Sequence, residues 1–192
     1  QEYPDHFWTP RITFVGLLDK PDKNGETLEQ GPTIALGIDL FSPNSRQLEI
    51  WDLKRKLTAG RLPVKTDEVL LSTKLANRLG LKPDQSVTFI GSTMHGSFST
   101  FNFYVAGTFS LNMGPVDKQM MIVDISGARL ALDMEDAASE ILGYTHSLYY
   151  EDQPTVVLSQ NFNINKSDST DMFSPIMLAL RDSNQMGDMV DF

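Results

Sequence analysis

The run from Glu68 to Ala106 constrains the fold more than any other part of the sequence, because independent local signals agree within it. Glu68–Leu71 (EVLL) is typical of a short buried strand, and Ser72 is placed to cap a helix by accepting a hydrogen bond from an unpaired backbone N–H. Gly80 predicts the end of that helix, since glycine adopts the left-handed conformation without a Cβ clash. The buried stripe of this capped helix is predicted to be Leu75, Ala76 and Leu79.

A β-hairpin is predicted directly after this helix. Ser86–Ile90 is strand-like, and apolar and polar side chains alternate along Phe101–Ala106. The segment between them, Gly91–Thr100 (GSTMHGSFST), is rich in Gly, Ser and Thr, which favours a connecting loop.

Two more strands are predicted near the N-terminus. Arg11–Leu18 and Thr33–Asp39 have apolar positions at strand spacing, with Gly16 interrupting the first. They are expected to pair as a hairpin with a long polar turn, Asp19–Gln30.

Helices are predicted on both sides of the central run. One is expected to begin near Asn44 or Ser45 and to stop at Gly60. Another follows a strand at Lys118–Asp124 and begins at Ser126, with Leu130 and Leu132 as its buried positions.

The C-terminal region combines a polar loop with a predicted helix. Asn161–Asp171 is interpreted as the loop, and Ser174-Pro175 as the start of the helix, because proline loses nothing at the first helical position. Strands mixed with short helices predict an α+β fold in two lobes. The apolar positions of the last helix continue almost to the chain end, at Ile176, Met177, Leu180, Met186, Met189 and Val190.

Composition excludes several classes of partner and site. The formal net charge is -9, which disfavours nucleic acid and anionic lipid as partners. There is no cysteine, so disulfides, thiolate metal sites and a cysteine nucleophile are ruled out. No stretch approaches the roughly 20 apolar residues that span a bilayer.

The sequence contains no recognisable catalytic, cofactor or metal constellation. His6, His95 and His146 lack partners at metal-ligand spacing, and Ser97 near His95 lacks the G-x-S-x-G elbow of a serine nucleophile. Phosphate-binding glycine motifs are absent as well. We therefore predict a non-catalytic domain without cofactor or metal. A cluster of acidic side chains is interpreted as a solvated helix end with charge at its N-terminus: Asp133, Glu135, Asp136 and Glu140.

Several strings, taken in order, resemble one protein family. They begin with Pro10-Arg11-Ile12 leading to Gly16-Leu17-Leu18, and Gly37-Ile38-Asp39 closes the next strand. Asp67–Leu71, Leu79-Gly80-Leu81-Lys82 and Phe103–Phe109 (FYVAGTF) follow. Together they resemble the extracytoplasmic, periplasmic core domain of ABC-transporter permeases of the MacB and LolC/LolE type.

The resemblance implies a domain that contacts partners and relays the motion of a cytoplasmic ATPase, itself a separate subunit or domain. It implies one extracytoplasmic domain over residues 1–192, with porter-like and sabre-like lobes and an inner lobe at about 61–125. Membrane helices are expected before residue 1 and after residue 192, and the domain itself is expected on the periplasmic side of a bacterial inner membrane. The isolated domain is expected to be monomeric.

In the lipoprotein-releasing branch of that family, a hairpin hook docks a periplasmic lipoprotein carrier. The equivalent hairpin here, Gly91–Phe101, contains no Pro, Arg or Lys, and would present an apolar tip instead. The cargo stays open between lipoprotein release, peptide or drug efflux, and regulation without transport. The alternative function is a free secreted, two-lobed protein that encloses a small ligand. The candidate partner-binding residues of the hairpin are Met94, His95, Phe98 and Phe101.

Overall fold

The computed structural model describes residues 6–112, 114–145 and 152–166. The chain divides into two compact units, one formed by residues 8–143 and the other by residues 1–7 with 144–192. The second unit holds one described helix, α5 (Asp152–Lys166). No helix among the described residues is long and apolar enough to cross a membrane.

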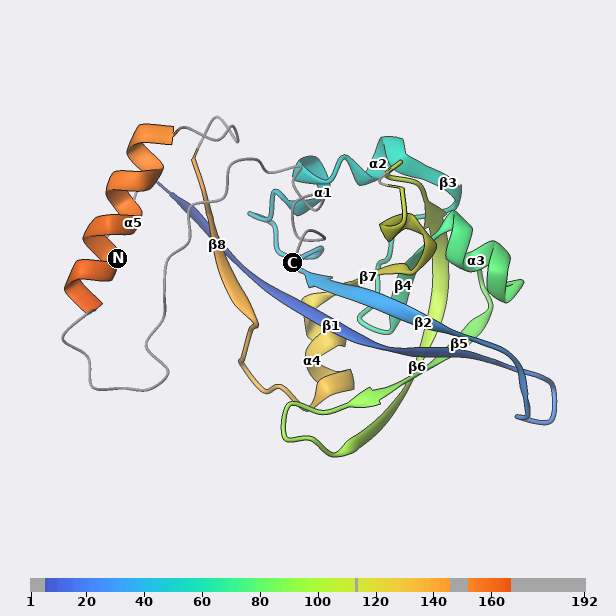
Figure 1. Cartoon of the computed structure of the whole chain (residues 1–192). Coiled ribbons are helices and arrows are strands. Elements are labelled where there is room, and N and C mark those ends of the chain that lie inside the picture. The colour runs from blue at the N-terminus through green and yellow to red at the C-terminus, as the bar shows by residue number, and fades with distance from the viewer. Residues whose placement is uncertain (1–5, 113, 146–151, 167–192) are drawn as a thin grey trace. The chain divides into compact units, whose positions relative to one another are not determined.

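The unit formed by residues 8–143 is built on one mixed sheet with short helices (Figure 1). Its helices are α1 (Gln47–Ile50), α2 (Leu53–Lys56), α3 (Thr73–Leu79), the 3-10 helix η1 (Val116–Lys118) and α4 (Ile125–Leu132). The strands, of which the first and last extend slightly beyond the unit, are β1 (Phe7–Pro21), β2 (Thr27–Ile38), β3 (Leu57–Gly60), β4 (Glu68–Ser72), β5 (Ser86–Ser92), β6 (Phe98–Phe109), β7 (Met120–Asp124) and β8 (Glu140–Tyr144).

Six of these strands close into a ring. The order is β2-β7-β4-β6-β5-β1, and β1 pairs with β2 again to complete the circuit. The β2–β7 and β4–β6 pairs are parallel, and the other four pairs are antiparallel. β3 pairs with β6 and β8 with β1, outside the ring. Because the ring is closed, none of the six strands that form it has an unpaired edge along its ring segment.

The hydrophobic core lies inside this ring. Side chains alternate along each strand, so Phe14 and Leu18 of β1 and Phe103 and Val105 of β6 point inward and are buried. Helices α3 and α4 also contribute apolar side chains to this hydrophobic core. Helix α3 contributes Leu75, Ala76 and Leu79, and α4 contributes Ile125, Ala128, Ala131 and Leu132.

A second buried layer covers the outer side of part of the ring. The intervening residues of β2, β4 and β7 are also buried, although they point away from the interior. The segment 39–60 is bonded to the end of β7 and to the residue after β6, because Leu40 N–H donates to Asp124 Oδ2 at 3.0 Å and Ser110 N–H donates to Lys56 O at 3.0 Å. The buried residues of this layer include Leu36, Ile38, Leu53, Leu70, Met120 and Ile122.

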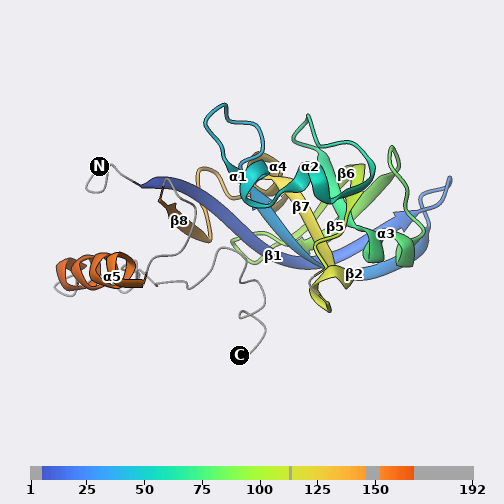
Figure 2. The ribbon, with the colours of Figure 1, turned by 90° about the horizontal axis from the view of Figure 1, so that it is seen from above.

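β1 and β2 extend beyond the ring as a two-stranded arm, visible in both ribbon views (Figures 1 and 2). Its last pairs, Asp19↔Gln30 to Pro21↔Thr27, end in a tight turn over Asp22–Glu26. The predicted hairpin is therefore confirmed, but its strands are longer and its turn much shorter than the predicted loop at Asp19–Gln30.

The central run follows its sequence signals closely. Ser72 Oγ accepts a hydrogen bond from Leu75 N–H at 3.2 Å and caps α3 as predicted. Gly80 has φ 59° and ends the helix, with Leu81 N–H donating to Ala76 O at 2.8 Å in the Schellman arrangement. The hairpin of β5 and β6 is confirmed with seven cross-strand pairs, but the predicted loop Gly91–Thr100 is too long, because its two ends pair with each other and leave a turn of only residues 93–97. The α+β fold class is confirmed.

The helix predicted from near Asn44 or Ser45 to Gly60 is wrong in its extent. Asp52 adopts a left-handed φ of 51°, which separates α1 from α2, and residues 57–60 form β3 because they pair with β6. The side chain of Arg46, which precedes α1, makes no capping bond, but Ser45 Oγ accepts a hydrogen bond from Gln47 N–H at 3.2 Å, close to the predicted start. Tertiary pairing has overridden the local pattern.

Two smaller predictions also need correction. In α4 the exposed position is Leu130, while Leu132 is buried as predicted. Asn161–Lys166, interpreted as part of a polar loop, belongs to α5. The predicted C-terminal helix from Ser174 and the histidine at 146 lie outside the described residues.

The predicted inner lobe at about 61–125 stays a prediction. Its strands β4 to β7 pair with one another and also with β1 and β2, within one ring.

Candidate functional site: the β5–β6 hairpin

The β5–β6 hairpin is a narrow ribbon whose turn is fixed by its own hydrogen bonds. The last cross-strand pair is Ser92↔Phe98. Thr93 N–H donates to Ser97 O at 2.8 Å, and Ser97 N–H donates to Thr93 Oγ1 at 3.1 Å. Gly96 takes a positive φ of 80°, which explains a glycine at this point of the turn.

The hairpin is fastened to the C-terminal end of α4. Met94 N–H donates to Leu132 O at 2.9 Å, and Ser99 Oγ–H donates to Ala131 O at 2.6 Å. The last carbonyls of a helix lack partners within the helix, so these two bonds satisfy α4 and position the hairpin together. The sequence analysis missed this anchor, because Met94 and Leu132 are far apart in sequence.

The four predicted partner-binding residues do not all lie at the tip. Met94 is 52% exposed, Phe98 is 75% exposed, and His95 is exposed as well. Phe101 is half-buried at the base of the hairpin and packs against the core, with its ring centroid 4.7 Å from that of Phe103. The structure therefore brings Met94, His95 and Phe98 together as an exposed tip and assigns Phe101 to its support.

The exposed tip presents two large apolar side chains, Met94 and Phe98, on an anchored ribbon. Methionine adapts its shape, and phenylalanine offers a large apolar area at low conformational cost. Among the described residues, no hydrogen bond joins the side chains of His95 and Ser97, and no third group orients them as a catalytic pair would require. The role of the tip in binding stays a prediction.

The acidic cluster is dispersed in the structure. Asp133 has φ 53° and ends α4, so its charge lies at the C-terminus of a helix and not at an N-terminus as predicted. Glu140 pairs with Arg11 at 2.8 Å, and Asp136 lies 3.9 Å from Arg129. Within the described ranges, no three His, Cys, Asp or Glu side chains are grouped closely enough to hold a metal ion.

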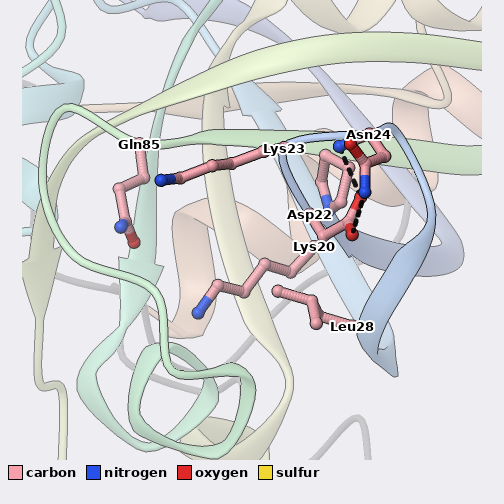
Figure 3. Close-up of a pocket in the computed structure, with 7 residues that line it drawn as sticks. Lys20, Asp22, Lys23, Asn24, Leu28 and Gln85 are labelled. Carbon is pink, nitrogen blue, oxygen red and sulfur yellow. Dashed lines mark hydrogen bonds between the residues drawn. The ribbon is translucent and has the colours of Figure 1, made fainter.

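A hollow of about 600 Å³ lies between the β1–β2 arm and the turn before β5 (Figure 3). It opens widely to solvent, and Lys20 Nζ is already committed to Gly80 O at 2.6 Å. Asp22 accepts bonds from the N–H groups of Asn24 and Glu26 and so belongs to the arm's turn. A site that encloses a small ligand buries most of the ligand's surface, so a hollow this open does not favour the ligand-binding alternative.

An ion pair between the buried carboxylate of Glu68, at the start of β4, and the half-exposed guanidinium of Arg61 was also missed by the sequence analysis. Arg61 donates to both carboxylate oxygens of Glu68, at 2.7 and 2.6 Å, and Val64 N–H donates to Glu68 Oε2 at 2.8 Å. These bonds to the charged form lower the pKa of Glu68 to about 2. The pair holds the loop 61–67 against the ring. A glutamate opening an otherwise apolar strand, seven residues after an arginine, is the signal that points to it.

Comparisons with known proteins identify the fold but not the family. No protein-family model matches the sequence, and no curated protein matches it. Among solved structures, the chain is similar to the periplasmic region of MacB from Actinobacillus actinomycetemcomitans, with a TM-score of 0.51 and 16% sequence identity. The similarity covers 95% of this chain and 74% of that one. The chain therefore has the fold of the periplasmic region of MacB.

Proposed function

We propose that this chain is the extracytoplasmic domain of an ABC-transporter permease. The observation that carries the proposal is the likeness of fold to the periplasmic region of MacB over 95% of the chain. The sequence strings between Pro10 and Phe109 also support the proposal, because their order resembles that in permeases of the MacB and LolC/LolE type. The absence of a cysteine and of a grouped metal site among the described residues is compatible with a domain that works by contact.

In this proposal the domain lies on the periplasmic side of the inner membrane and responds to a cytoplasmic ATPase. The work of the domain is to relay that motion and to contact cargo or a periplasmic partner. The β5–β6 hairpin is the contact point, because its tip is apolar, exposed and fixed to α4 by two hydrogen bonds. Lipoprotein release is one form that this function would take.

The flanking gene sequence tests the assignment to a permease. We expect apolar segments of about 20 residues to be encoded shortly before Gln1 and shortly after Phe192, since such a domain lies between two membrane helices. Sequencing the gene on both sides decides the point. Stop codons or polar sequence on both sides would sink the permease proposal.

A capture experiment tests the hairpin. We expect Met94→Asp and Phe98→Asp to reduce capture of the periplasmic partner by tenfold or more, about 1.4 kcal/mol, because each buries a charge in an apolar contact. The matched control is Leu28→Asp, whose side chain is 58% exposed at the arm and away from the hairpin. The wild-type domain is used to pull down its partner from periplasmic extract. That partner is then purified and titrated against the wild-type domain and each variant. If both hairpin variants bound like Leu28→Asp, the hairpin would not be the contact site.

A further inference from the structure

The turn of the β1–β2 arm holds the one asparagine of the sequence that is followed by glycine. Asn24 and Gly25 lie in the middle of the tight turn Asp22–Glu26 (Figure 3). An Asn-Gly pair is favoured in hairpin turns, because both residues tolerate the backbone conformations that such turns require. Gly25 uses this freedom, with a φ of 85°. The turn explains the pair, and it also places two groups that react with each other side by side.

The reaction joins the main-chain nitrogen of Gly25 to the side-chain amide carbon of Asn24. When Gly25 N attacks Asn24 Cγ, a cyclic imide forms and the Cγ–Nδ2 bond breaks. The proton of Gly25 N–H leaves with the departing NH2 group, so ammonia is released. Water then adds to one of the two carbonyl carbons of the imide. Addition at Cγ gives aspartate, whereas addition at the main-chain carbon breaks the original peptide bond and gives isoaspartate, in which the main chain runs through Cβ and Cγ.

The turn leaves room for this attack. Glycine has no side chain that hinders its nitrogen, and a Cβ built at Gly25 would meet no atom within 4 Å. Asn24 and Gly25 are both exposed to the water that the second step consumes. Gly25 N–H donates to Asp22 O at 3.2 Å, the long end of the hydrogen-bond range, so the bond that must be released first is a weak one. Asparagine is among the thermolabile residues of proteins, and this asparagine has the least hindered neighbour.

We infer that Asn24 is a site of spontaneous deamidation, and that its isoaspartate product opens the end of the β1–β2 arm. Two bonds between Asp22 and Glu26 close the turn. Glu26 N–H donates to Asp22 Oδ1 at 2.9 Å, and Asp22 N–H donates to Glu26 O at 2.7 Å. Isoaspartate adds one carbon to the main chain between Asn24 and Gly25, so both bonds lose the geometry that they need.

Deamidation also reverses the electrostatics of the turn. In the unmodified chain, Asn24 Nδ2 donates to Asp22 Oδ2 at 3.4 Å. Both products carry a carboxylate in place of this amide, so a donor beside Asp22 is replaced by a like charge. The added charge and the added carbon therefore act in the same direction.

The opening is confined to the arm. The last pair between β1 and β5 is Asp19↔Thr88, and the register of β1 on β2 shifts between Lys20 and Pro21. Beyond this point the arm is held by its own turn and by Lys20 Nζ, which donates to Gly80 O at 2.6 Å. The ring strands have neighbours on both sides and stay closed. This chemistry is independent of what the domain binds.

Mass spectrometry of the full chain measures the modification. The chain is kept at mildly alkaline pH and physiological temperature, and samples are digested with trypsin at successive times. The tryptic peptide of residues 24–46 carries Asn24 together with Asn44, an exposed asparagine in another turn that is followed by Ser45. We expect Asn24 to deamidate at least about tenfold faster than Asn44, because serine has a side chain that hinders its nitrogen and glycine has none. Equal rates would overturn the inference.

Amide hydrogen exchange, followed by NMR, measures the opening. In the isoaspartate form of the aged chain, we expect Glu26 N–H to exchange at least about tenfold faster than in fresh chain, because it has lost its acceptor on Asp22. Ile34 N–H, which donates to Gln119 O at 2.8 Å, should exchange at its original rate.

Two variants separate the contributions. Asn24→Gln keeps an amide on a longer side chain that closes the imide ring poorly, so it should keep Glu26 N–H protected after the same incubation. Fresh Asn24→Asp carries the charge without the extra carbon, so its Glu26 N–H should exchange faster than in wild type but slower than in the isoaspartate form. An aged wild type in which Glu26 N–H exchanges as in Asn24→Gln would overturn the inference. So would an Asn24→Asp chain that exchanges as fast as the isoaspartate form, because the extra carbon would then open nothing.

Discussion

Replacing Phe89 with alanine is expected to lower the free energy of unfolding by about 3–5 kcal/mol, the largest effect of any substitution considered for this chain. Phe89 is fully buried inside the ring of strands. Its ring meets that of Phe14 edge to face, with centroids 5.3 Å apart and planes at 85°. The substitution removes both the buried area and this aromatic contact.

The cavity left by Phe89 cannot close easily. Gly16 on β1 and Gly91 on β5 lie against the phenyl group of Phe89, and a Cβ at either position would overlap that phenyl group. These glycines have no side chain to move into the vacated space, and their strands are held in the sheet by cross-strand hydrogen bonds. The cost should therefore fall in the upper part of the range for large-to-small core substitutions.

Urea unfolding followed by circular dichroism measures the effect. The control is Phe98→Ala, which removes the same side chain from the neighbouring strand where it is 75% exposed, and which we expect to leave stability nearly unchanged. Equal losses for the two variants would contradict the placement of Phe89 in the core.

Gly16 shows what sequence reasoning reaches and what it misses. The sequence shows a glycine interrupting the apolar positions of a strand, and the strand was nevertheless predicted. The reason for the glycine appears only in three dimensions, since the residue it accommodates, Phe89, is 73 positions away in sequence. Close packing of this kind has no local signature.

Elements specified by neighbouring residues were predicted well, and those specified by distant partners were not. Helix α3 carries its own start at Ser72 and its own stop at Gly80, so both ends were found. Residues 57–60 look helical in continuation of the preceding segment but form β3, because β6 offers a strand to pair with. The ring closure depends on the parallel pairs of β2 with β7 and β4 with β6, which no local pattern encodes.

The candidate site follows the same division. The hairpin and its exposed apolar tip were predictable from alternation and from the loop Gly91–Thr100. The support of that tip was not, because it comes from the last carbonyls of α4 at Ala131 and Leu132. Phe101 was assigned to the tip for the same reason: alternation alone does not show which end of β6 joins the core.

Glu68→Gln is expected to lower the free energy of unfolding by about 1–2 kcal/mol at neutral pH, because it removes the charge from a buried carboxylate that forms a bidentate pair with the half-exposed, partly solvent-screened Arg61. Glu68 is 5% exposed and accepts two bonds from the guanidinium and one from Val64 N–H. An amide of the same shape keeps the packing and loses the charge-assisted bonds.

The pH dependence of this loss gives the sharper test. The pKa of Glu68 falls from 4.5 to about 2 on folding, chiefly because Arg61 donates to its charged form. The unfolded chain therefore binds this proton at higher pH than the folded chain does. The stability that the carboxylate contributes is complete above pH 4.5 and is lost as the pH falls toward about 2. The difference between wild type and Glu68→Gln should accordingly be largest near pH 7 and shrink steadily below pH 4.5.

Measuring both proteins at each pH isolates Glu68, because all other carboxyl groups titrate alike in the two. Glu49→Gln serves as the matched control. Glu49 pairs with Arg46 at 3.1 Å in an exposed i,i+3 arrangement, and such pairs contribute little to stability. We expect Glu49→Gln to unfold with wild type at every pH. A Glu68→Gln difference that stayed constant from pH 7 down to pH 3 would show that the substitution perturbs packing, and that Arg61 does not stabilise the Glu68 carboxylate in the folded chain.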